Sequence, residues 1–348
     1  MIGFNYFGKN HKKTVKDCGE YECYCRTKNF KKRTGIPTKN IVIFGNCHFQ
    51  EIQRNIIQYK TIRAHYLPHY ISINSYVDLN ASLLGRTYFT DTHINLFKNA
   101  DILIYQNIET DRGFLNNKEV GKLIPKNCIK IKIPHYRSSI YHYSFYETPY
   151  FEEMKQLVDK EETVNQKITC IKDFIKNINE TTQDTNSFDK FITKELTHFK
   201  KIDSYSDISM YDYFINNYKK IKLINGRSYP TSIFMFILSK KILEKLNIYE
   251  NLSFTEMING RTVYPRYFAL HTDYPIFDFW YDYNKFTFNK QYYWELEIPM
   301  KDYEFYYLQI DIYNRFGKNK IFNDTVFIRS KFNGLDEVKK LRDIINNT

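Results

Sequence analysis

The segment from residue 40 to residue 50 limits the possible folds of this chain more than any other stretch of its sequence. Its apolar residues Ile41 to Phe44 run directly into the tripeptide Gly45-Asn46-Cys47. A short, continuous apolar run bounded by a turn is typical of a strand that is buried on both faces. Apolar residues then recur at helical spacing, so we expect a helix from Glu51 to about Tyr66. The segment therefore predicts a strand, a tight turn and a helix in succession.

The cysteine at this turn is placed where its thiol can take part in chemistry. A helix N-terminus stabilises negative charge, and a cysteine there forms the reactive thiolate more readily. The same backbone N–H groups can bind a phosphate or a developing oxyanion. Cys47 is therefore either a nucleophile that carries an acyl group or a structural thiol beside an oxyanion site. Gly45 allows the tight turn, Asn46 offers a side-chain donor, and we expect the backbone N–H of His48, more than its ring, to assist.

The alternation of strands and helices continues beyond this turn. Apolar runs at 70–73, 102–105 and 128–133 predict three more strands, with helical patterns between them. Such an alternation predicts an α/β fold in which helices cover a mainly parallel sheet. Since parallel strands end at the same edge of a sheet, we expect Gln106 to face the same crevice as Cys47. Its amide could bind a carbonyl oxygen, and Asn107 is the alternative for this role.

The C-terminal part of the chain has a different pattern. Four stretches there predict strands, three of them from the alternation of apolar and polar residues: 281–288, 291–299, 303–312 and 321–328. A final helix is expected at 335–345. The sequence thus predicts three regions, which are an N-terminal arm at 1–38, an α/β domain at 39–248 and a β-rich aromatic extension at 249–348.

Several blocks, in their order along the chain, resemble the WcbI-like family of polysaccharide-biosynthesis acyltransferases. They are the Gly45-Asn46-Cys47 turn, the strand block 100–106 that ends in Gln106, and the strand-Pro-aromatic block 131–143. A further block at 213–246 matches in part, because Tyr229 stands where the family carries the His of a His-Pro-Ser segment. Family members are similar to SGNH hydrolases with Cys in place of Ser. The resemblance therefore implies a three-layer α/β/α domain.

The resemblance also implies a function. It indicates an acetyltransferase that moves an acetyl group from acetyl-coenzyme A to a sugar in glycan biosynthesis, without a metal. A nucleotide-linked amino sugar is the preferred acceptor. Two alternatives stay open: a sugar O-deacetylase or esterase on the same scaffold, and a non-catalytic glycan-binding module. Tyr229 in place of His weakens the hydrolase, because hydrolysis requires an activated water.

Further polar residues are candidates for the site. His271, with Asp273 two residues later, is a candidate catalytic group beside Cys47, His48, Gln106 and Tyr229. Together with Gly45 and Asn46, Arg137 and Arg227 are expected to bind the coenzyme, since guanidinium groups hold phosphate in bidentate fashion. The residues expected to bind substrate are Asn107, His135, Tyr136 and His142. Either of these two histidines is also an alternative source of the acid–base group.

Charge and composition limit the partners. The 348 residues carry a formal net charge of +12, which favours anionic partners such as coenzyme A and nucleotides. No nucleic-acid motif of known spacing occurs, so nucleic-acid binding is not expected. No signal peptide and no membrane-length apolar run are visible, which predicts a cytoplasmic protein with reduced thiols. The abundance of Tyr, Lys, Asn and Ile fits an AT-rich genome such as that of a giant virus, which would place the protein in the host cytoplasm.

Overall fold

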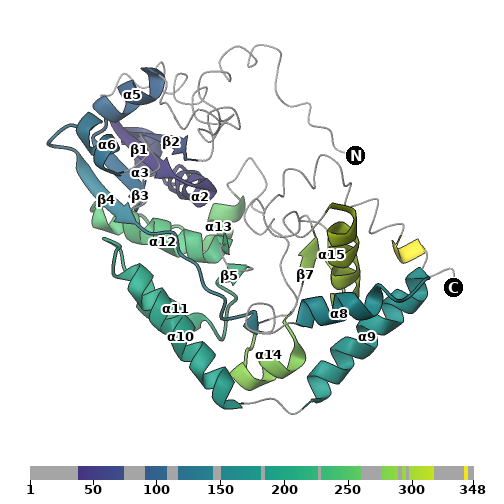
Figure 1. Cartoon of the computed structure of the whole chain (residues 1–348). Coiled ribbons are helices and arrows are strands. Elements are labelled where there is room, and N and C mark those ends of the chain that lie inside the picture. Colours follow the sequence, from purple (N-terminus) through teal and green to yellow (C-terminus); the bar gives the residue numbers. More distant parts are fainter. Residues whose placement is uncertain are drawn as a thin grey trace. The chain divides into compact units, whose positions relative to one another are not determined.

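The structure is a computed structural model that describes residues 38–73, 91–107, 117–143, 150–181, 185–225, 229–259, 276–288, 292–294, 298–316 and 341–343. The chain divides into two compact units (Figure 1). The first, called the sheet unit here, draws on Met1–His135, Ile202–Met210 and Ser232–Pro265. The second, the helical unit, draws on Tyr136–Lys201, Tyr211–Thr231 and Arg266–Thr348. The predicted regions divide the chain at other positions.

The sheet unit is built on a parallel sheet of four strands in the order β2-β1-β3-β4. These strands are β1 (Lys39–Gly45), β2 (Tyr66–Ser72), β3 (Ile102–Gln106) and β4 (Ile129–Ile133). The central strand β1 pairs Phe44 with Ile71 on one side and with Tyr105 on the other. Ile41 to Phe44 are fully buried, as the continuous apolar run predicts. The prediction of an α/β fold with a parallel sheet is confirmed.

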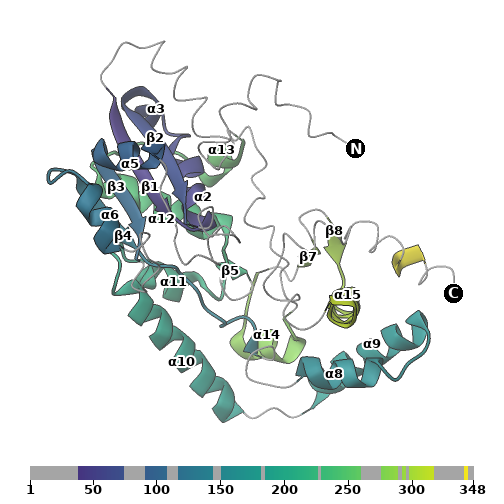
Figure 2. The same ribbon diagram turned by 45° about the horizontal axis from the view of Figure 1, so that its top comes forward.

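Helices cover both faces of this sheet (Figure 2). On one face, Val42 and Phe44 pack with Phe97 of α5 (Asp91–Lys98) and Val120 of α6 (Asn117–Leu123). On the other face lie α2 (Cys47–Ile56) and α12 (Ser232–Lys245), which contact each other. The short helices α3 (Lys60–His65) and α13 (Phe254–Asn259) complete the described part of this unit. The result is the expected three-layer α/β/α arrangement.

The predicted helix and strand after the first turn differ in their bounds. The helix begins at Cys47, four residues before the predicted start at Glu51, and a break after Ile56 separates α2 from α3. The second strand begins at Tyr66 rather than at residue 70. The helix begins earlier than predicted because the side chain of Asn46 caps its first turn.

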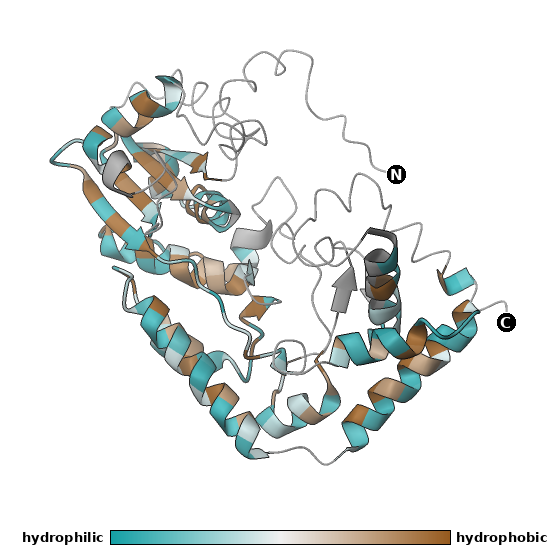
Figure 3. Cartoon of the chain, viewed as in Figure 1, coloured by the Kyte–Doolittle hydropathy of each residue, from teal (hydrophilic) through white to brown (hydrophobic). Residues whose placement is uncertain are grey.

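The described part of the helical unit is mainly α-helical. Its helices are α8 (Tyr150–Val158), α9 (Val164–Glu180), most of α10 (Thr185–Asp203), α11 (Tyr211–Asn217), α14 (Asp278–Asn284) and α15 (Asp302–Phe316). Two hairpins accompany them, β5 (Ile224–Asn225) with β6 (Tyr229–Pro230), and β7 (Tyr292–Trp294) with β8 (Ile298–Met300). Phe151, Met154, Ile171, Phe277 and Tyr306 belong to one buried cluster. Figure 3 shows apolar and hydrophilic residues side by side along α9 and α10, as expected for helices with one buried face.

Two of the strand predictions for the C-terminal part are wrong. Residues 281–288 contain most of helix α14, and 303–312 lie within helix α15. Along α15 the side chains at 304, 306, 308 and 310 are all buried, because the helix is covered on more than one side. Because every second residue in this stretch of α15 is buried, its sequence shows the period of two that is typical of a strand. The hairpin of β7 and β8 confirms the strand prediction at 291–299 in part.

Other predictions lie outside the described residues. These include the strand at 321–328, all but residue 38 of the arm at 1–38, and most of the helix at 335–345, of which 341–343 are helical. Among the helices of the described ranges, none is both long enough and apolar enough to cross a lipid bilayer.

Candidate functional site

The turn between β1 and α2 is held by hydrogen bonds of Asn46. Its backbone is extended, and its side-chain Oδ1 accepts a hydrogen bond of 3.1 Å from the backbone N–H of His48. Its carbonyl oxygen accepts another of 2.9 Å from the N–H of Phe49. The first N–H groups of a helix have no partner within the helix, and a capping side chain supplies one. Asn46 is therefore the N-cap, and Cys47 is the first residue of α2.

The backbone N–H of His48, which is expected to assist an oxyanion, already donates a hydrogen bond within the turn. The N–H of His48 points to Asn46 Oδ1, so an acyl oxygen would have to displace that side chain to reach it. Asn46 acts here as an acceptor, whereas the sequence suggested a donor role for its side chain. A donor for a developing negative charge is therefore better sought on a neighbouring strand.

Gln106, the last residue of β3, supplies such a group. Its Oε1 accepts a hydrogen bond of 2.9 Å from the backbone N–H of Asn46. Only the oxygen of a side-chain amide can accept from an N–H, so this bond determines which end of the amide faces the turn and which end carries the two N–H donors. The structure thus brings Gln106 to the residue that precedes Cys47, as the order of the strands predicts. Asn107 follows, and its backbone N–H donates to the carbonyl of Ile133, which continues the hydrogen bonding between β3 and β4 by one residue.

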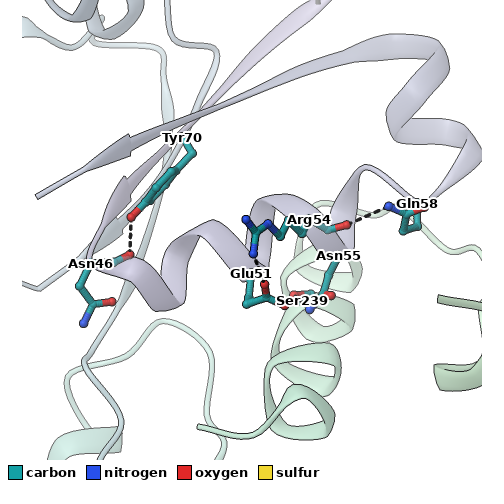
Figure 4. Close-up of polar contacts among 7 residues, drawn as sticks. All are labelled: Asn46, Glu51, Arg54, Asn55, Gln58, Tyr70 and Ser239. Carbon is teal, nitrogen blue, oxygen red and sulfur yellow. Dashed lines mark hydrogen bonds and ion pairs between the residues drawn. The ribbon is translucent and has the colours of Figure 1, made fainter. Parts of the chain in front are cut away.

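Two aromatic residues that no sequence motif marks support the turn. The hydroxyl of Tyr70, on β2, donates to the carbonyl of Asn46 at 2.7 Å (Figure 4) and lies 3.3 Å from that of Gly45. The ring of Phe49 packs directly on Gly45, where an added Cβ would lie 2.2 Å from the Phe49 Cγ atom. Glycine is thus required at position 45 by the close approach of this ring, in addition to any demand of the turn.

Two histidines meet beside the turn. The ring of His48 is buried, with 4% of the residue exposed, and its centroid lies 4.9 Å from that of His135 at an interplanar angle of 49°. His135 is half-buried and follows β4 and Pro134. Both residues belong to the sheet unit. The ends of β1, β3 and β4 therefore bring Asn46, Gln106 and His135 to the same edge of the sheet.

A buried polar row continues along α2. Glu51 is fully buried and accepts a hydrogen bond of 2.9 Å from Arg54, and Asn55 donates to Ser239 of α12 at 3.1 Å (Figure 4). A buried carboxylate requires such a partner. Polar residues at this spacing are typical of a solvated helix face, so the sequence alone gave no reason to place them in an interface. In the structure Asn55 joins the helix that begins with Cys47 to α12, whereas Glu51 and Arg54 pair within α2.

Among the residues that the structure describes, four of the predicted site residues belong to the helical unit. Tyr136 and His142 are core residues there, each with no more than 2% exposed, and Tyr136 stacks on Phe199 with ring centroids 5.4 Å apart. Arg137 is exposed, and Tyr229 is half-buried in β6, opposite Asn225. Arg227 and His271 lie outside the described residues. Among the described side chains, no group of three or more His, Cys, Asp or Glu is arranged to hold a metal ion.

Comparison with known proteins identifies a shared fold. No family model matches the chain, and no curated protein sequence matches it. A solved structure of WcbI, described as a polysaccharide biosynthesis enzyme, is similar over 87% of this chain and 98% of its own, with a TM-score of 0.55 and 13% sequence identity. The two chains share a fold. The WcbI structure is of the native protein without a disulfide bond between coenzyme A and one of its cysteines. At this level of identity, the likeness to WcbI concerns the fold alone.

Proposed function

We propose that this protein is an acetyltransferase that moves an acetyl group from acetyl-coenzyme A to a sugar in glycan biosynthesis. The observation that carries the proposal is the hydrogen bond from Asn46 to Gln106 Oε1, which orients a side-chain amide beside the helix N-terminus at Cys47. Acyl transfer requires preorganised donors where negative charge develops. The fold shared with WcbI, a polysaccharide biosynthesis enzyme described in relation to coenzyme A, supports the same reaction class.

The proposed reaction places the thioester carbonyl at the N-terminal end of α2. The amine of the acceptor attacks the carbonyl carbon, and the carbonyl oxygen becomes negatively charged. The amide N–H groups of Gln106 donate to this oxygen, and the positive end of the α2 dipole stabilises it further. The C–S bond then breaks, so that coenzyme A leaves as a thiolate and the acetyl group remains on the nitrogen. In an alternative route, the Cys47 thiolate accepts the acetyl group first.

The charge of the chain suits the proposed donor. Coenzyme A carries several phosphate groups, and the formal net charge of +12 favours its association. Gly45 and Asn46 stay candidates for contacts at the reacting end of the coenzyme. We propose a nucleotide-linked amino sugar as the acceptor and the cytoplasm as the location, because coenzyme A and nucleotide sugars are available together there.

Release of free thiol from acetyl-coenzyme A tests the proposal. The protein is incubated with acetyl-coenzyme A alone, with glucosamine, and with UDP-glucosamine, and the thiol is followed by a colorimetric reagent. Acceptor-dependent release is expected for a transferase. Release that is independent of acceptor would instead indicate a thioesterase, and no release with either acceptor would contradict the proposed reaction for amino sugars.

A further inference from the structure

The proposed transfer needs an acid–base group, and the described part of the sheet unit offers two next to the turn. Tyr229, which stands at the position of the family histidine, carries a phenol, and phenols ionise near pH 10 in general. Histidine is the side chain suited to proton transfer near neutral pH. His48 and His135 are the histidines that meet at the edge of the sheet where α2 begins.

The position of His135 follows from the strand register. Gln106 pairs with Ile133 between β3 and β4, and His135 lies two residues beyond that pair. Its ring contacts the ring of His48, which is the residue directly after Cys47. His135 therefore lies at the same end of the sheet as the Gln106 amide and the first turn of α2.

The two rings differ in their access to solvent. His48 has 4% of its surface exposed, so its ring cannot reach a substrate without rearrangement. His135 is half-buried, so part of its surface is open at the edge of the sheet. A ring that exchanges a proton with an acceptor must be accessible, and a ring that only orients it need not be. The exposure of the two rings thus assigns them different roles.

We infer that His135 is the acid–base residue of the transfer and that His48 is the positioning residue that holds its ring. This inference rests on the proposed acetyl transfer. As the C–N bond forms, the ring of His135 accepts the proton that leaves the acceptor nitrogen. When the C–S bond breaks, the proton passes from His135 to the sulfur of coenzyme A. The products are the acetylated amine and the free thiol, and His135 returns to its neutral form.

The test compares variants in the acceptor-dependent thiol assay with glucosamine and UDP-glucosamine. His135→Ala is expected to lower kcat by about 10²-fold or more with little change in the KM for acetyl-coenzyme A. Added imidazole is expected to restore part of this rate, because it can occupy the vacated space and carry the proton. His135→Gln, which keeps the size and polarity of the side chain, should show the same loss. The exposed His65 on α3 provides a control, and His65→Ala should keep the wild-type rate.

His48→Ala separates positioning from chemistry. It should lower kcat by a smaller factor of about tenfold, and imidazole should not restore the rate, since the base itself is still present. Folded His135 variants with the wild-type rate, or a loss that imidazole does not repair in His135→Ala, would overturn the inference. Absence of acceptor-dependent turnover in the wild-type protein would overturn the proposed function itself, so the two failures can be told apart.

Discussion

The side-chain oxygen of Gln106 accepts a hydrogen bond of 2.9 Å from the backbone N–H of Asn46. This bond joins the last residue of β3 to the N-cap of α2, and it determines the orientation of the Gln106 amide. One end of the amide therefore stabilises the turn, while the other end carries the donors proposed for the acyl oxygen. Stability and catalysis can be separated at this residue, because they depend on different atoms.

Replacement of Gln106 by Glu or Leu is expected to have different effects on folding. Gln106→Glu keeps an acceptor for the Asn46 N–H, so its free energy of unfolding should stay close to that of the wild type. Gln106→Leu leaves the N–H without this acceptor, which should cost about 1–3 kcal/mol. Urea denaturation of both variants measures the difference. Equal stabilities for the two variants would show that the bond does not support the turn.

The same two variants are expected to lose activity together. Both lack the amide N–H donors, and loss of one oxyanion donor typically lowers kcat by about 10²–10³-fold. The acceptor-dependent thiol assay measures this. If Gln106→Glu were as active as the wild type, the Gln106 amide would not be the donor to the acyl oxygen.

Gly45→Ala is expected to destabilise the sheet unit. The new methyl group would lie 2.2 Å from the Phe49 ring, and relief of such an overlap typically costs about 1–3 kcal/mol. The matched control is Gly121→Ala in α6, where, apart from the adjacent residues and the backbone of the helix itself, no atom of the described residues lies within 4 Å of an added Cβ. Alanine favours a helix, so this control should gain up to about 1 kcal/mol. Thermal denaturation of the two variants should shift in opposite directions, and a shift in the same direction would contradict the packing described.

The strands of the sheet could be predicted because their sequence leaves few alternatives. Ile41 to Phe44 are continuous and apolar, which is typical of a strand with both faces covered, and parallel strands place their following turns at one edge. The position of Gln106 near Cys47 follows from that topology. The contacts of Tyr70 and Phe49 could not be inferred, since they depend on which neighbours the strand and helix meet after packing.

The helical unit shows where sequence patterns fail. Aromatic residues make up 18% of the chain. At this frequency, apolar and polar residues alternate in some segments that do not belong to a β-sheet. In α14, Trp280 is buried and its indole N–H donates to the carbonyl of Ile140, 140 residues earlier in the chain. In α15, burial on several sides removes the helical period. Contacts between distant segments therefore determine that these residues are helical. Such contacts cannot be recognised in a local sequence pattern.

The stability of the protein is expected to fall between pH 6.5 and about 4 because of His93. Burial in α5 lowers the pKa of His93 from 6.5 to about 4. Below pH 6.5 the unfolded chain takes up a proton that the folded chain does not bind until about pH 4, so the stabilising effect is fully present above pH 6.5 and decreases as the pH falls through this window. The full change should be about 3 kcal/mol.

Urea denaturation across this pH range, for the wild type and for His93→Gln, measures the effect. The variant should lose most of the slope, and His65→Gln, at an exposed position, should keep it. An unchanged slope in His93→Gln would show that other groups cause the acid sensitivity.

Tyr70→Phe is expected to loosen the turn without unfolding the protein. It removes the hydroxyl that donates to the Asn46 carbonyl at 2.7 Å, which should cost about 0.5–1.5 kcal/mol. The control Tyr205→Phe, at a residue that is 40% exposed, should change the free energy of unfolding by much less. Chemical denaturation of both variants is the measurement, and equal effects would mean that the hydroxyl of Tyr70 does not support the turn.

Protection of Cys47 from alkylation tests most directly whether acetyl-coenzyme A binds at the turn from Gly45 to Cys47. The protein is treated with iodoacetamide under reducing conditions, with and without a titration of acetyl-coenzyme A, and each cysteine is quantified by peptide mass spectrometry. Cys170, half-buried on α9 in the helical unit, is the internal control. At about ten times the dissociation constant, alkylation of Cys47 should slow about tenfold, while that of Cys170 should not change. Equal alkylation rates for Cys47 with and without acetyl-coenzyme A would contradict the proposed site.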